Sequence, residues 1–153
     1  MQNVVEMDPS LLANYWRLMR FYEQKGEFEK ALQMREDYAK FAKEHARELS
    51  LQALLLRKAY ASTGARGYWN QELQFLKTQK TNNVKGGACC DDAIGIVYAR
   101  LGRREEAIRS LEQAFNDHIP YLIWELPASP DLNPLRSDPR FADLLARLLH
   151  RSE

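Results

Sequence analysis

The chain has 153 residues, of which 45% are hydrophobic and 28% charged, so it carries enough apolar material for a folded domain and does not read as a disordered polar tail. Its 22 Lys and Arg side chains are interleaved with 21 Asp and Glu side chains, which argues against a sustained basic surface and direct binding to nucleic acid. No stretch approaches the ~18 consecutive apolar residues of a membrane-spanning helix, so we expect no membrane insertion.

A repeated pattern organises the chain up to residue 117. Compared with itself at a shift of 38 residues, as from position 18 to 56 to 94, the chain aligns an apolar residue, a Tyr four positions later and a Gly four positions after that. The aligned residues are Leu18, Tyr22 and Gly26, then Leu56, Tyr60 and Gly64, then Ile94, Tyr98 and Gly102. The apolar residue and the Tyr share one helix face, and the Gly can take the left-handed conformation that ends the helix. Each copy therefore predicts a helix, a tight turn and a second helix.

The predicted elements follow in chain order. Apolar residues at spacings of three and four, together with many Ala, Leu, Glu, Lys and Arg residues, indicate helices near 10–25, 28–47, 49–63, 67–80, 88–101 and 104–117. The second of these is extended through KFAKEHARELS, and the polar linker KTNNVKGG precedes the third copy. We therefore expect an all-α chain of about three helical hairpins, at 10–47, 49–80 and 88–117.

The third copy, DDAIGIVYARLGRREEAIRSLEQAF, resembles a tetratricopeptide repeat (TPR), in which small residues such as Gly95 and Ala107 let paired helices approach closely. The resemblance implies that the hairpins form a right-handed α-α superhelix. The first copy has Met19 at the small position, and the second has Arg57 and Trp69 where small residues belong. We therefore expect a wider helix spacing in the second hairpin.

The tail from 118 to 153 resembles the segment that closes such arrays in bacterial signalling proteins, with PLRSDPRF as its most specific string. A terminal repeat exposes an apolar face, so we expect a capping helix near 120–125 and a last helix from Pro139 to His150, with Asp138 as its N-cap. The residues expected to cover that face are Leu122, Trp124, Phe141, Leu144, Leu145 and Leu148. The opening VVEMDPS looks like the end of a preceding repeat, through Asp8 and Pro9, which suggests a fragment of a longer protein.

Sequence motifs give no support for an enzyme. No Walker-type, dinucleotide-binding, H-E-x-x-H or G-x-S-x-G motif occurs, so no catalytic residue, metal ligand or cofactor is predicted. His45, His118 and His150 are far apart and are expected at helix ends or in a loop, in contact with solvent or with carbonyl groups. Gly86 and Gly87 lack the Lys-Ser/Thr signature of a phosphate loop and are interpreted as a connector.

The only two cysteines are the neighbours Cys89 and Cys90, followed by Asp91 and Asp92. We interpret them as buried or half-buried thiols in a reducing, cytoplasmic compartment. A thiol-based redox switch is an alternative, because the start of a helix lowers the pKa of a thiol. Adjacent side chains on a helix point about 100° apart, which disfavours a metal site there.

In TPR proteins, which this chain resembles, the first helices of successive stacked repeats line a concave surface that receives a peptide or a partner helix. The residues predicted to bind a partner there are Trp16, Arg20, Gln24, Leu54, Lys58, Ser62, Asp92, Ile96 and Arg100. Trp16 and Arg20 are the expected anchors, since Trp and Arg dominate binding energy at interfaces. One TPR subgroup grips a C-terminal carboxylate, but the matching positions here do not reproduce that clamp.

These observations favour a protein–protein interaction module over an enzyme. The tail resemblance implies the regulatory or scaffold part of a bacterial signalling or transcriptional regulator protein. Self-association into a homodimer through exposed apolar surface is the main alternative. The redox switch at Cys89 and Cys90 is a third hypothesis, and replacing both residues with Ser would test it.

Overall fold

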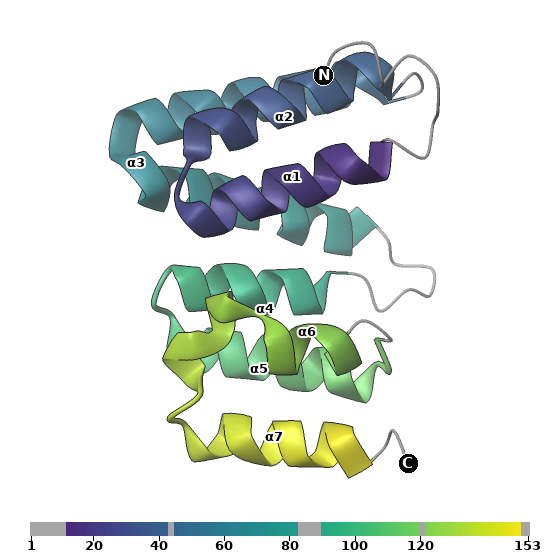
Figure 1. Ribbon diagram of the computed structural model, residues 1–153, viewed down its shortest axis with the longest axis vertical. Coiled ribbons are helices and arrows are strands. Elements are labelled where there is room, and N and C mark those ends of the chain that lie inside the picture. The colour runs from purple at the N-terminus through teal and green to yellow at the C-terminus, as the bar shows by residue number, and fades with distance from the viewer. Residues whose placement is uncertain (1–11, 43–44, 83–89, 120–121, 151–153) are drawn as a thin grey trace. The chain divides into compact units, whose positions relative to one another are not determined.

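The computed structural model describes residues 12–42, 45–82, 90–119 and 122–150 (Figure 1). The helices are α1 (Leu12–Lys25), α2 (Phe28–Phe41), α3 (Ala46–Asn82), α4 (Asp91–Arg100), α5 (Arg104–Asn116), α6 (Leu122–Ala128), the 3-10 helix η3 (Pro130–Leu135) and α7 (Pro139–His150). The described ranges contain no strand, so the predicted all-α fold class is confirmed. The chain divides into two compact units, Met1–Gln71 and Glu72–Glu153.

The first helices of the first and third copies end in the same way. Gly26 and Gly102 both have φ +73°, a left-handed conformation that residues with a Cβ rarely adopt. At each end the residue after the Gly donates its backbone N–H to the carbonyl oxygen of the repeated Tyr. The Gly donates its own N–H to the carbonyl oxygen of the residue after that Tyr, and the two bonds together are the Schellman pattern. The bonds are Glu27 to Tyr22 (2.9 Å), Gly26 to Glu23 (3.1 Å), Arg103 to Tyr98 (2.9 Å) and Gly102 to Ala99 (3.0 Å). The predicted glycine turns are therefore confirmed at these two positions.

The second copy turns differently. α3 runs from Ala46 to Asn82 but is interrupted at Thr63 (φ −137°, ψ 23°) and Gly64 (φ 62°, ψ −146°). The break falls where the helix ending at residue 63 was predicted to stop. Its ψ puts Gly64 in a region open almost only to glycine, outside the left-handed helical conformation expected for a cap.

Two predicted helix boundaries are wrong. The helix predicted over 28–47 ends at Phe41, and Ala42 leaves helical geometry at ψ 59° while donating its backbone N–H to the Tyr38 carbonyl. The surrounding KFAKEHARE consists of helix formers, so local propensity carries no signal for this end. The helix predicted from residue 88 begins at Asp91, because Cys90 takes φ +82° and acts as its N-cap.

In the first unit, an aromatic cluster and a buried polar group join the three helices. Phe28 of α2 has its ring centroid 4.9 Å from that of Tyr68 and 5.7 Å from that of Trp69, both on α3. The Tyr68 hydroxyl donates a 2.6 Å hydrogen bond to the carboxylate of Glu23, whose side chain is only 2% exposed. Arg35 of α2 also contacts this carboxylate, at 3.4 Å. A buried carboxylate is tolerated only with such partners, so this network fixes α1 against α2 and α3.

In the second unit, α4 and α5 form the closely packed pair that the small residues predict. A Cβ built on Gly95 would lie 2.7 Å from Cγ of Leu111 and 3.3 Å from the Ala107 carbonyl oxygen, so no larger residue fits without a shift. Ala107 and Leu111 are buried. The close approach predicted at Gly95 and Ala107 is therefore confirmed.

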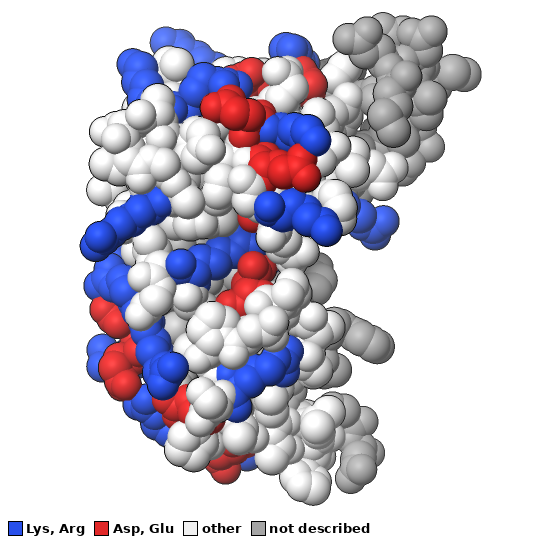
Figure 2. Space-filling model, turned by 60° about the vertical axis from the view of Figure 1, so that its left-hand side comes forward, with Lys and Arg blue, Asp and Glu red and all other residues white. Residues whose placement is uncertain are grey.

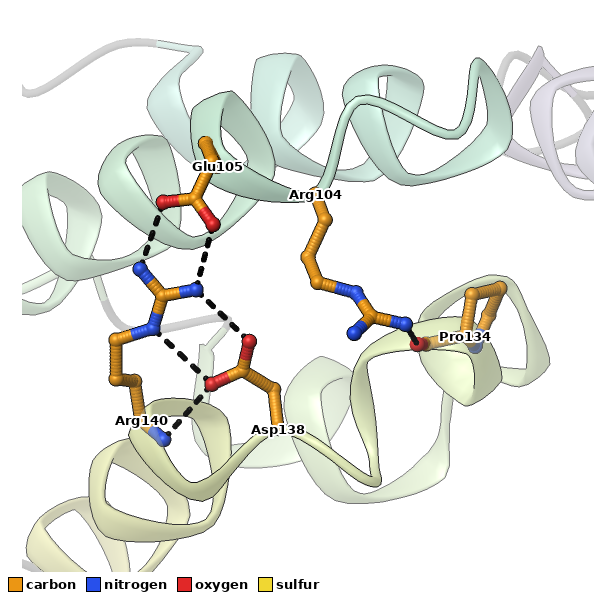
Figure 3. Close-up of polar contacts among 5 residues, drawn as sticks. All are labelled: Arg104, Glu105, Pro134, Asp138 and Arg140. Carbon is orange, nitrogen blue, oxygen red and sulfur yellow. Dashed lines mark hydrogen bonds and ion pairs between the residues drawn. The ribbon is translucent and has the colours of Figure 1, made fainter.

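The C-terminal cap is docked by arginines of the tail and its neighbours (Figure 3). Arg140 of α7 bonds both carboxylate oxygens of Glu105 on α5, at 2.7 and 2.8 Å, and also Asp138, at 2.8 Å. Arg104 donates to the Pro134 carbonyl oxygen at 3.2 Å. Hydrogen bonds from Arg140 are the main reason why the pKa values of Glu105 and Asp138 are lowered. These contacts join α5, η3 and α7 into one end of the unit.

The last helix begins and ends as the sequence predicts. The Asp138 carboxylate accepts the Arg140 backbone N–H at 3.0 Å, which is the predicted N-cap, and Pro139 is the first helical residue. Leu122, Phe141, Leu144 and Leu148 are buried, Leu145 is half-buried, and the side chain of Trp124 lies outside the described residues. The predicted helix near 120–125 is found at Leu122–Ala128, and η3 was not predicted.

Candidate functional site

Most of the predicted partner-binding residues of the first unit face solvent. Trp16 is 52% exposed and Leu54 is 47% exposed, and the polar side chains of Gln24, Lys58 and Ser62 are exposed as well. Arg20 is half-buried. On α1, the spacing of four residues places Trp16, Arg20 and Gln24 on one stripe; Leu54, Lys58 and Ser62 form the corresponding stripe on α3.

The predicted residues of α4 do not form such a surface. Ile96 is 1% exposed, and the Arg100 side chain is 7% exposed and ion-paired with Asp131 of η3 at 2.7 Å. Asp92 is half-buried. Ile96 and Arg100 therefore leave the candidate surface: Ile96 is buried, and Arg100 is paired with η3, an element that the sequence did not predict and that packs on α4.

The structure adds three residues that the sequence analysis missed. Arg17, Phe21 and Lys25 form a second stripe on α1, one position after the first, and all three are exposed, with Phe21 at 49%. The Lys25 ammonium lies 5.6 Å from the centroid of the Phe21 ring, a cation–π contact. The same spacing of four that selected Trp16 could have found them. We call the six residues of the two stripes, Trp16, Arg17, Arg20, Phe21, Gln24 and Lys25, the α1 face.

The α1 face carries cations and no acid. The only acidic residue of α1 is Glu23, which is held inside the unit by Tyr68 and Arg35. Arg17 and Lys25 form no ion pair with any acid in the described ranges. α1 thus presents the large aromatic side chains of Trp16 and Phe21 next to Arg17 and Lys25.

The acids of α2 do not compensate these cations. Glu29 and Glu36 pair with Arg57 at 2.8 and 2.9 Å, Asp37 pairs with Lys40 at 2.8 Å, and Glu27 pairs with Lys30. The hydrogen bond that Arg57 donates to Glu36 is the main cause that raises the pKa of Arg57. Figure 2 shows both blue and red side chains on one face of the molecule. The acids of α2 therefore leave Arg17 and Lys25 without an acidic partner in the described ranges.

The predicted thiol cluster differs from expectation. Cys90 is disulfide-bonded, so the free thiol predicted at this position is not present. Asp91 is buried and its carboxylate accepts a 2.6 Å contact from Lys80, which gives it a structural role at the start of α4. Cys89, Gly86 and Gly87 lie outside the described residues, as do Asp8 and Pro9.

Within the described ranges, no group of three or more His, Cys, Asp or Glu side chains could hold a metal ion. None of the helices described is both long enough and apolar enough to cross a membrane. Comparison with known proteins finds no family model, no curated protein and no solved structure that matches the chain.

Proposed function

We propose that this chain is a protein-binding module built from TPR-like helical hairpins, and that it binds its partner through the α1 face. The observation that carries the proposal is the exposure of Trp16 and Phe21 beside arginines on a helix whose opposite side is well anchored. Trp and Arg are enriched among the residues that dominate binding energy, and interface cores are rich in aromatic residues.

The repeat resemblance supports the TPR-like part of the proposal. The identical turns at Gly26 and Gly102 and the close approach at Gly95 are what stacked helical hairpins require. As part of the same proposal, the hairpins stack into a right-handed superhelix.

The tail string PLRSDPRF is accounted for by its structural contacts. Leu135 and Phe141 are buried, Asp138 caps α7, and Arg140 joins α7 to α5. Arg136 donates to the Pro127 carbonyl oxygen at 2.8 Å. The string therefore specifies a cap, and the role in signalling or transcriptional regulation rests on the family resemblance alone.

Cross-linking in cells tests the binding function. The full chain is compared with Trp16→Ala/Arg20→Ala and with a control, Arg109→Ala/Leu149→Ala, which likewise removes one cation and one exposed apolar side chain but from α5 and α7. A partner captured by wild type and control but lost from the Trp16 variant, with all three proteins equally helical by circular dichroism, supports the proposal. Equal capture by all three contradicts it.

Self-association is the second candidate function, favoured by exposed Leu51 (55%) and Leu54 on α3 and Leu149 (58%) on α7. Light scattering on the full chain separates it from the first. A concentration-independent dimer mass that Leu51→Ser/Leu54→Ser reduces to a monomer mass would assign that surface to a second copy of the chain.

A further inference from the structure

We infer that the α1 face binds an acidic amphipathic helix, in which apolar side chains reach Trp16 and Phe21 while flanking Glu or Asp side chains meet Arg17 and Lys25. The inference rests on the proposed function and adds the chemistry and the secondary structure of the partner.

The geometry of the α1 face favours a helical partner. Trp16, Arg20 and Gln24 lie in one row along α1, and Arg17, Phe21 and Lys25 lie in the next, each at a spacing of four residues. Rows of this spacing are the ridges by which two helices pack, the ridges of one fitting between those of the other. α1 has 14 residues, a length of about 21 Å at 1.5 Å per residue, which suits a partner helix of about four turns.

The charge of the α1 face favours an acidic partner. Lys25 stands over the Phe21 ring and Arg17 is exposed beside it, so acidic side chains next to an apolar anchor gain contacts with both. Because Glu23 is buried and bonded to Tyr68, no acid of α1 competes for these cations. Complementary charges of this kind raise the rate of association and suppress binding of wrongly charged partners.

The same charge argues against a second copy of the chain on the α1 face. A two-fold dimer through this face would place the α1 face of one copy against the α1 face of the other. The cations Arg17 and Lys25 of one copy would then lie near the cations of the second copy. Like charges across an interface are destabilising. Nucleic acid is disfavoured because exposed Trp16 and Phe21 take the place of further cations along the helix.

The test uses the full chain and two fluorescein-labelled peptides of about 16 residues, a length of four to five helical turns. The first has Leu at helical spacing flanked by Glu, and its twin has Gln in place of every Glu. Fluorescence anisotropy gives both affinities. We expect the wild-type chain to bind the Glu peptide at least about five-fold more tightly than the Gln twin, with the ratio shrinking between about 50 and about 300 mM salt as exposed charges are screened.

Variants of the chain locate the effect. Arg17→Glu/Lys25→Glu should weaken the Glu peptide by about ten-fold or more and change the Gln twin little, since two attractions become repulsions. Arg66→Glu/Arg109→Glu reverses two exposed cations elsewhere and is the control for net charge. Trp16→Ala/Phe21→Ala should weaken both peptides.

Each failure has its own pattern. Equal affinity for the two peptides, or an equal loss in the Arg66 control, overturns the inference; if Trp16→Ala/Phe21→Ala still weakens both peptides, the proposed function survives. If no variant changes either affinity, the inference and the proposed function both fail.

Absence of binding to either peptide also overturns the inference, and the cross-linking experiment then decides the proposed function alone. An oligo-dT strand that binds more tightly than the Glu peptide and is lost in Arg17→Glu/Lys25→Glu would assign the α1 face to nucleic acid instead.

Discussion

The first and last helices described, α1 and α7, differ in which side chains are buried and which charges are paired. α7 buries Phe141, Leu144 and Leu148, and its arginines are paired, Arg140 with Glu105 and Asp138 and Arg147 with Asp143. α1 buries its acid and leaves aromatic side chains and cations in solvent. α7 thus closes its unit with paired arginines, whereas α1 keeps aromatic and cationic side chains in solvent, as our proposal that α1 binds a partner requires.

The largest expected difference between the two helices is in stability. Phe141→Ala should lower the free energy of unfolding by about 3–5 kcal/mol, because it leaves a cavity in the cap. Trp16→Ala should change it by no more than about 0.5 kcal/mol, since that side chain is half in solvent. Urea denaturation of the full chain followed by circular dichroism measures both. Comparable losses in the two variants would mean that α1 is a closing helix too.

The inner side of α1 should be sensitive where its outer side is not. Tyr68→Phe removes the hydroxyl that donates to buried Glu23 and should cost about 1–3 kcal/mol of stability. Tyr60→Phe is the matched control, because the Tyr60 hydroxyl forms no hydrogen bond within the described ranges. Urea denaturation compares the two. A Tyr68→Phe effect as small as that of the control would show that the Glu23 network does not anchor α1.

Acid should weaken the cap through its paired carboxylates. The pKa values of Glu105 and Asp138 lie below their ordinary values of 4.5 and 3.8, chiefly because Arg140 donates hydrogen bonds to them. Their stabilisation is therefore complete above these ordinary values and is lost as the pH falls through the lowered ones. Melting temperatures measured from about pH 7 to about pH 3 should fall less steeply in Arg140→Gln than in wild type.

Arg17→Gln is the control for this pH dependence, since Arg17 has no acidic partner in the described ranges. Its melting temperature should follow the wild-type pH profile. A profile for Arg140→Gln that matches the wild type would exclude the Arg140 contacts as a source of acid sensitivity.

The smallest expected effects concern helix ends. α5 ends in the same hydrogen-bond pattern as α1, but His118, at φ +59°, holds the position that Gly26 holds after α1. His118→Gly should stabilise the chain by about 0.5–1 kcal/mol, since a left-handed residue with a Cβ is strained. Gly26→Ala should destabilise the chain by about 1 kcal/mol, because Ala is strained in the same left-handed conformation. A Cβ there meets no neighbour within 4 Å, so no steric clash adds to this cost. Thermal melting checks both signs, and a destabilising His118→Gly would mean that the bond between its Nδ1 and the Asn116 carbonyl oxygen outweighs the strain.

Periodicity and turn residues predicted most of the fold. The glycine turns at Gly26 and Gly102, the N-cap at Asp138 and the close approach at Gly95 depend on local geometry that single residues reveal. Two features could not be predicted from the sequence. The end of α2 at Phe41 has no Gly or Pro to mark it, and the short helix η3 contains Pro and Asn, which are typical of loops.

The surface proposed from the structure overlaps the surface predicted from the sequence only in part. The spacing rule selected Trp16 and Arg20 but stopped one stripe short of Phe21. It also retained Arg100, whose burial depends on Asp131, 31 residues away, a pairing that no periodicity contains.

The turn at Gly26 also bears on how the chain folds during synthesis. α1 and α2 are joined by two residues, so their hairpin can close as soon as Phe41 has left the ribosome. Contacts that are this close in sequence carry little loop-closure entropy and form quickly. The α4–α5 hairpin has a similarly short connection of three residues, so a new copy of the unit can be added to such a chain without slowing the folding of those already made.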